Sequence, residues 1–149
     1  MNINLSLRNG IPFITAEFIN DNNKISTKNI LIDTGAGSSI LSSDIAIEIG
    51  LTPGPNDVIN RVRGVGGYEF VYQKSIEKIK IGDTEVCNFT IEVGDMDYGF
   101  DIDGILGTDF LRASKAVIDM DKLMIRFKND VSGNILCFGR ISIWEDEKG

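Results

Sequence analysis

The chain has 149 residues, which favours one domain over residues 1–149, and its formal net charge is -7. The acidic balance argues against nucleic acid and anionic membrane surfaces as partners. Since neither a bilayer-spanning apolar run nor a signal peptide is seen, we expect a cytoplasmic protein. The absence of histidine excludes Ser-His and Cys-His nucleophile pairs and histidine metal sites. Acid–base chemistry without a cofactor must therefore rest mainly on carboxylates, Lys, Tyr or Cys.

The N-terminal third of the chain predicts strands joined by polar turns, followed by a helix. The strand candidates lie at residues 2–7, 13–19 and 26–33. The apolar end of the last of these, "ILI", reads as buried. Residues 38–50 have helical content, with Ser43 as a plausible N-cap and Gly50 as the stop.

The rest of the chain is also rich in strand patterns. A glycine-rich tip between strand residues predicts a hairpin over residues 59–72, and a "GDT" turn joins two further strands within residues 74–93. After an acidic loop and the short apolar run "GILG", residues 108–113 predict a brief helix. Further strand candidates lie at residues 115–128, as a hairpin, and 134–144. The fold class is therefore mainly β, with one or two short helices.

Two cysteines, Cys87 and Cys137, lie far apart in the sequence, and no CxxC spacing pairs them. We expect two reduced, buried thiols rather than a disulfide or a metal site.

Asp33 stands directly after an apolar run, in the stretch "LIDTGAGSSIL". A carboxylate in such a setting is costly to bury unless something compensates. Two carboxylates held close together share a proton, and can then act as general base and general acid in hydrolysis. An aspartate after a strand is also commonly a turn or cap residue, so the residues alone are equally consistent with a purely structural role for Asp33.

Three stretches together resemble the retropepsin-like aspartic proteases. "LIDTGAGSSIL" is similar to the active-site stretch of that family, "DGILGTDFL" to its second signature, and "RGVGGYEF", between them, to its flap. The similarity of organisation covers roughly residues 10 to 128. It implies a small closed β-barrel and an aspartic endopeptidase without cofactor or metal. Because the chain has one Asp-Thr-Gly rather than two, the resemblance implies a homodimer that cleaves peptide or protein substrates.

The resemblance also implies roles for individual residues. Asp33 would be catalytic, with Thr34 bridging the two loops of the dimer and Gly35 allowing their close approach. Gly107 would let the second signature pack beneath the turn. The active-site support then comprises Thr34, Gly35, Ala36, Ile105, Leu106 and Gly107. The flap and substrate-binding residues comprise Gly64, Val65, Gly66, Gly67 and Tyr68, together with Gly37 and Ser38.

Some features of the sequence differ from the family pattern, and others have a second interpretation. Gly37 stands where retroviral members have an acidic residue that holds the substrate main chain, and the region after the second signature is longer. The hairpin tip could be ordinary, and we expect Thr108 or Asp109 simply to cap the short helix. The acids at 95, 97, 101 and 103 fail the EF-hand pattern, so we expect a solvated acidic loop.

Two other functions remain open. One is a dimeric peptide-binding module that keeps the protease fold and cleaves little or nothing. The other is a phosphate-binding loop of the actin and sugar-kinase type, although those folds need a much longer chain and no nucleotide site is apparent.

Overall fold

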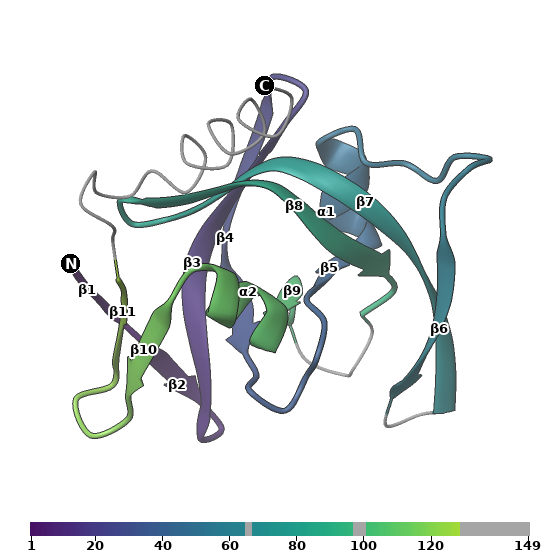
Figure 1. Ribbon diagram of the computed structural model, residues 1–149. Coiled ribbons are helices and arrows are strands. Elements are labelled where there is room, and N and C mark those ends of the chain that lie inside the picture. The colour runs from purple at the N-terminus through teal and green to yellow at the C-terminus, as the bar shows by residue number, and fades with distance from the viewer. Residues whose placement is uncertain (65–66, 97–100, 129–149) are drawn as a thin grey trace, which may run out of the picture.

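The structure is a computed structural model, which describes residues 1–64, 67–96 and 101–128 (Figure 1). Within the described residues, two short helices accompany the strands: α1 (Ser43–Glu48) and α2 (Thr108–Ala113). The strands are β1 (Asn2–Asn4), β2 (Ser6–Arg8), β3 (Ile11–Asn20), β4 (Asn23–Ile32), β5 (Ile40–Ser42), β6 (Ile59–Gly64), β7 (Gly67–Ile81), β8 (Thr84–Gly94), β9 (Gly104–Leu106), β10 (Ala116–Asp119) and β11 (Met124–Phe127). In the described part of the chain, neither helix is long or apolar enough to cross a membrane.

The main sheet closes into a six-stranded barrel. Its strands follow the order β3-β4-β9-β5-β8-β7, and β7 returns to pair with β3 through Phe18 and Ile79. β2 and β6 extend the sheet beyond this ring, each paired with one neighbour. The described part of the chain is mainly β, with a closed barrel and two short helices, which confirms the expected class.

The short central strands of the barrel are covered on both faces. β9 runs parallel to β4 and antiparallel to β5, so that Ile105 lies beside both Leu31 and Ile40. Those three residues pack against a small cluster of Phe13, Met96 and Ile102. Their sequence neighbours on the same strands, among them Ile30, Ile32, Leu41 and Leu106, face the main core. Burial on both faces explains why the strands read as continuous apolar runs.

A second, three-stranded sheet joins the two ends of the described chain. β1 pairs with β11, and β10 pairs with the other edge of β11, all antiparallel. Ile125 and Phe127 point into the main core, where Phe127 meets Phe110 of α2 with ring centroids 6.5 Å apart. Phe110 also meets Phe89 of β8 at 5.5 Å. This aromatic contact fixes α2 between the barrel and the second sheet.

Two local expectations were wrong, namely the N-cap of the first helix and the reduced state of Cys87. The helix expected before Gly50 is present as α1, but its N-cap is Ser42, whose hydroxyl accepts the Asp44 N–H at 3.3 Å, and not Ser43. Residues 40–42, within the stretch expected to have helical content, form strand β5. The short run "ILS" is strand because β8 and β9 both offer it a hydrogen-bonding edge. Cys87 of β8 is disulfide-bonded rather than reduced. Cys137 and the strand candidate at 134–144 lie outside the described residues.

Candidate active site

Asp33 follows β4 directly and begins a tight turn. Its backbone N–H donates to the Leu106 carbonyl at 3.0 Å, which continues the parallel pairing of β4 with β9. Its own carbonyl accepts the Ala36 N–H at 3.2 Å, and its carboxylate Oδ1 accepts the Gly35 N–H at 2.9 Å. The carboxylate is therefore held in one orientation by its own loop, while the side chain stays half-buried at the end of the barrel.

The residues that follow Asp33 lie at the surface. Thr34, Gly35, Gly37 and Ser38 are exposed, and Ala36 is half-buried. Gly35 is close to the carboxylate, because a Cβ built there would lie 3.2 Å from Asp33 Oδ1. This part of the loop is accessible to a substrate or to another protein chain.

The second signature lies against the Asp33 turn. Leu106 is buried in the core, whereas Ile105 faces the smaller cluster beside Leu31. At Gly107 a Cβ would meet the Ala36 carbonyl oxygen at 2.6 Å, so the two loops touch through their backbones. The Thr108 N–H then donates to that same oxygen at 2.8 Å.

Sequence reasoning missed a hydrogen-bonded link between Ser39 and Asp109. The N-cap of α2 is Gly107, with no side-chain capping bond, so the expected N-cap at Thr108 or Asp109 is wrong, and Asp109 accepts only the Phe110 N–H within the first turn of α2. The Asp109 carboxylate also accepts the Ser39 hydroxyl at 2.7 Å and the Ser39 N–H at 3.1 Å. The Ser39 hydroxyl oxygen in turn accepts the Gly107 N–H at 2.9 Å. The one available signal was a serine placed immediately before the apolar pair Ile40-Leu41.

The predicted flap is a long hairpin formed by β6 and β7. Gly64 and Gly67 pair at its described end, and Tyr68 pairs with Arg63. Val65 and Gly66 lie outside the described residues. In Figure 1 the hairpin leaves the barrel and extends toward the end of the molecule where the loop after β4 also lies.

Polar contacts anchor the base of this hairpin. The Tyr72 hydroxyl donates to the Leu51 carbonyl at 3.1 Å. The pKa of Tyr72 is raised, mainly because the side chain is partly buried and to a smaller extent because the carboxylates of Asp57 and Asp95 are nearby. Lys74 Nζ lies 2.9 Å from Asp57 Oδ1. This hydrogen-bonded partner, and then the Gly54 N–H, hold the pKa of Asp57 below its usual value. The loop before β6 is thus tied to β7.

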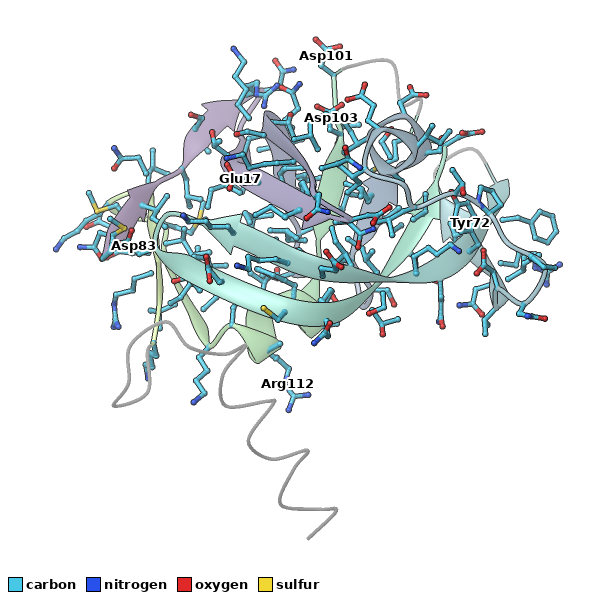
Figure 2. All side chains as sticks on the ribbon, turned by 90° about the horizontal axis from the view of Figure 1, so that it is seen from above. Glu17, Tyr72, Asp83, Asp101, Asp103 and Arg112 are labelled. Carbon is cyan, nitrogen blue, oxygen red and sulfur yellow. The ribbon has the colours of Figure 1, made fainter. Side chains whose placement is uncertain are left out.

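The acidic loop is less uniformly solvated than expected. Asp103 is half-buried and accepts the Thr27 hydroxyl at 2.5 Å and the Asn29 amide at 3.1 Å. Figure 2 shows Asp101 at the rim, pointing away from the ribbon, with Asp103 closer to the strands. Asp97 lies outside the described residues. Among the residues the structure describes, no group of acidic or cysteine side chains is arranged to hold a metal ion.

These features match a known protein family. The family model described as "Aspartyl protease" matches residues 15–110, which include the Asp33 turn and the second signature. The chain belongs to the aspartyl protease family. This aspartyl protease family member is also similar to the UBA domain-containing protein Mud1 of Schizosaccharomyces pombe, at 35% identity over 97 residues. That match covers 64% of this chain and 28% of the length of Mud1.

A solved structure supports the same family assignment. The retropepsin-like aspartic protease from Rickettsia conorii superposes with a TM-score of 0.61 at 27% identity. The match covers 85% of this chain and 89% of the Rickettsia chain. The resemblance to retropepsin-like proteases inferred from the three sequence stretches is therefore confirmed.

Proposed function

We propose that the chain is an aspartic endopeptidase whose catalytic dyad consists of Asp33 from each of two identical chains. The observation that carries the proposal is the Asp33 turn itself. It presents a half-buried carboxylate at the end of β4, beside an exposed Thr-Gly pair. Backbone hydrogen bonds to Leu106 and Thr108 hold this turn against the second signature.

The chemistry requires two carboxylates. One takes a proton from a water molecule as the water oxygen attacks the peptide carbonyl carbon, and the other donates its proton to the carbonyl oxygen. As the tetrahedral intermediate collapses, the C–N bond breaks and the leaving nitrogen receives a proton. A shared proton between the two carboxylates supplies both roles at once.

A second chain is the proposed source of the second carboxylate. The sequence has one Asp-Thr-Gly, and the carboxylate of Asp109 in the second signature is already engaged by Ser39 and Phe110. A two-fold axis between two Asp33 turns would bring identical carboxylates together. The exposure of Thr34 and Gly35 is consistent with such an approach, with Thr34 hydroxyls bridging the two loops.

The substrate in this proposal is a peptide or an unfolded protein segment. Leu31, Ile40 and Ile105 are only partly buried against the Phe13 cluster, and their remaining exposed parts are the apolar surface that we propose for substrate side chains. Apolar substrate side chains would lose contact with water against it. The β6–β7 hairpin would cover the bound peptide, with Gly64 and Gly67 at the base of its tip.

The test is cleavage of a denatured protein or a peptide library by the wild-type chain and by Asp33→Asn. We expect cleavage by the first and none by the second. Wild-type and Asp33→Asn chains are then mixed under exchange conditions, and activity is measured against the wild-type fraction. A shared dyad predicts a curve below the straight line, because heterodimers are inactive.

Other results would contradict the proposal. Activity that follows the wild-type fraction linearly would show that each chain acts alone. Peptide binding without cleavage, equal in both variants, would favour the dimeric peptide-binding module.

A further inference from the structure

We infer that Asp109 is a positioning residue that holds the Asp33 turn in its working shape through Ser39 and Gly107. The inference rests on the proposed function, because it names the group that keeps that site in order. The hydrogen bonds of the Asp109 carboxylate join it to Ser39 and Phe110 rather than to Asp33. Any effect on the dyad is therefore indirect.

Both carboxylate oxygens of Asp109 are used. Oδ2 accepts the Ser39 N–H at 3.1 Å, while Oδ1 accepts the Ser39 hydroxyl at 2.7 Å and the Phe110 N–H at 2.7 Å. Ser39 has 0% of its surface exposed, so water cannot replace these partners. A carboxylate is the suitable side chain here because it offers two acceptor oxygens and, when ionised, no competing donor.

The Asp109 carboxylate also fixes the direction in which the Ser39 hydroxyl hydrogen points. Because Asp109 can only accept, the hydroxyl hydrogen points at it, and an oxygen lone pair remains for the Gly107 N–H at 2.9 Å. The chain of bonds thus runs from Gly107 to Ser39 and on to Asp109. Hydrogen bonds to a charged acceptor are stronger than neutral ones, and linked bonds polarise one another.

Gly107 carries this constraint to the Asp33 turn. The residue before it, Leu106, accepts the Asp33 N–H, and the residue after it, Thr108, donates to the Ala36 carbonyl. These two bonds hold the first and last residues of the turn. Since the Gly107 Cα position leaves no room for a Cβ against Ala36, a small displacement of Gly107 would be transmitted to the turn.

A purely local role for Asp109 makes a different prediction. An acidic residue in the first turn of a helix is favourable because the helix N-terminus carries a partial positive charge. Asp44 occupies the corresponding place in α1, which has the same length as α2. Among the described residues, no hydrogen bond joins the Asp44 side chain to residues 33–39. Asp44→Asn is therefore the matched control for loss of charge at a helix start.

The experiment compares Asp109→Asn, Ser39→Ala, the double variant and Asp44→Asn. The asparagine offers one acceptor oxygen to the two Ser39 donors, so one of them loses its partner. We expect Asp109→Asn to lower kcat about tenfold with little change in KM, and Asp44→Asn to leave both unchanged. The double variant should be no worse than the poorer single variant, because both act through one link.

Amide hydrogen exchange supplies a readout that does not need activity. The Gly107 and Ser39 amides should exchange faster in Asp109→Asn than in the wild type, while amides in the β7–β8 pairing stay protected. If Asp109→Asn fails to fold, Asp109→Glu retains the acceptors at a longer reach, and it should fold with intermediate kcat and exchange.

The outcomes separate the two proposals. Unchanged kcat together with unchanged Gly107 exchange in Asp109→Asn, or an equal loss of kcat in Asp44→Asn, would overturn the role of Asp109. If the wild type cleaves no better than Asp33→Asn, the proposed function fails, whereas faster Gly107 exchange in Asp109→Asn would still support the positioning link.

Discussion

Replacing Gly107 with alanine would place a methyl group where the structure has no room for it. The new Cβ would lie 2.6 Å from the Ala36 carbonyl oxygen and 3.0 Å from both the carbonyl carbon and oxygen of Ser38. All of these atoms belong to the backbone, so no side-chain rotation relieves the contact. The Asp33 turn or α2 must move instead.

Gly37 provides the matched control in the same loop. A Cβ at Gly37 would meet nothing within 4 Å, and its backbone does not adopt a left-handed conformation. Alanine in place of glycine also restricts the unfolded chain, which stabilises a protein by about 0.4–1 kcal/mol where the native conformation tolerates it. That contribution is common to both variants, so the difference between them isolates the steric cost.

Overpacking of this kind costs about 1–3 kcal/mol. We therefore expect Gly107→Ala to be less stable than Gly37→Ala by about 1–3 kcal/mol in free energy of unfolding. The measurement is urea denaturation followed by circular dichroism, at one fixed protein concentration because self-association contributes to apparent stability. Equal midpoints for the two variants, with unchanged slopes, would refute the close contact between the two loops.

Three further predictions concern the core, the dimer and the hairpin base. Phe110→Ala should lower the free energy of unfolding by about 3–5 kcal/mol because it empties a fully buried aromatic site, and Phe110→Leu should cost less; denaturation midpoints measure both. Thr34→Ala should weaken dimerisation more than Thr34→Ser, and analytical ultracentrifugation measures this difference. Thermal unfolding of the monomer should be the same for both variants. Because Lys74 lowers the pKa of Asp57, the ionised carboxylate favours the folded state above the usual pKa, and this contribution disappears as the pH falls through the lowered value. The stability difference between wild type and Asp57→Asn should therefore be constant at neutral pH and shrink below about pH 4, and a difference that grows in acid would contradict the assignment.

Local sequence patterns were sufficient for much of the fold and for the central turn. The apolar residues before Asp33 read as a buried strand, and the structure covers that strand on both faces. The small residues after it allow the backbone hydrogen bonds that orient the carboxylate. The "ILG" run resembled a known partner of this turn, and β9 does pair with β4.

Long-range contacts determine the conformation of Ile40-Leu41 and the hydrogen-bond partners of Asp109, which local sequence patterns did not predict. The short apolar run at Ile40-Leu41 fits a helix as well as a strand, and only the neighbouring edges of β8 and β9 make it a strand. Asp109 and Ser39 are far apart in the chain, so local propensity favours a helix cap for Asp109. The antiparallel pairing of β5 with β9 brings Ser39 and Asp109 together, and the carboxylate accepts hydrogen bonds from Ser39.

The pairing of β1 with β11 also sets an order of events during synthesis. Asn4 pairs with Met124, so about 120 residues must be added before the N-terminal strand can find its partner. At a translation rate of about 5–20 residues per second, this interval is roughly 6–24 s. Most of the barrel strands become available for pairing within that time, while β1 remains an unpaired segment. Its length of three residues and its polar Asn2 and Asn4 make it a poor template for aggregation with other nascent chains.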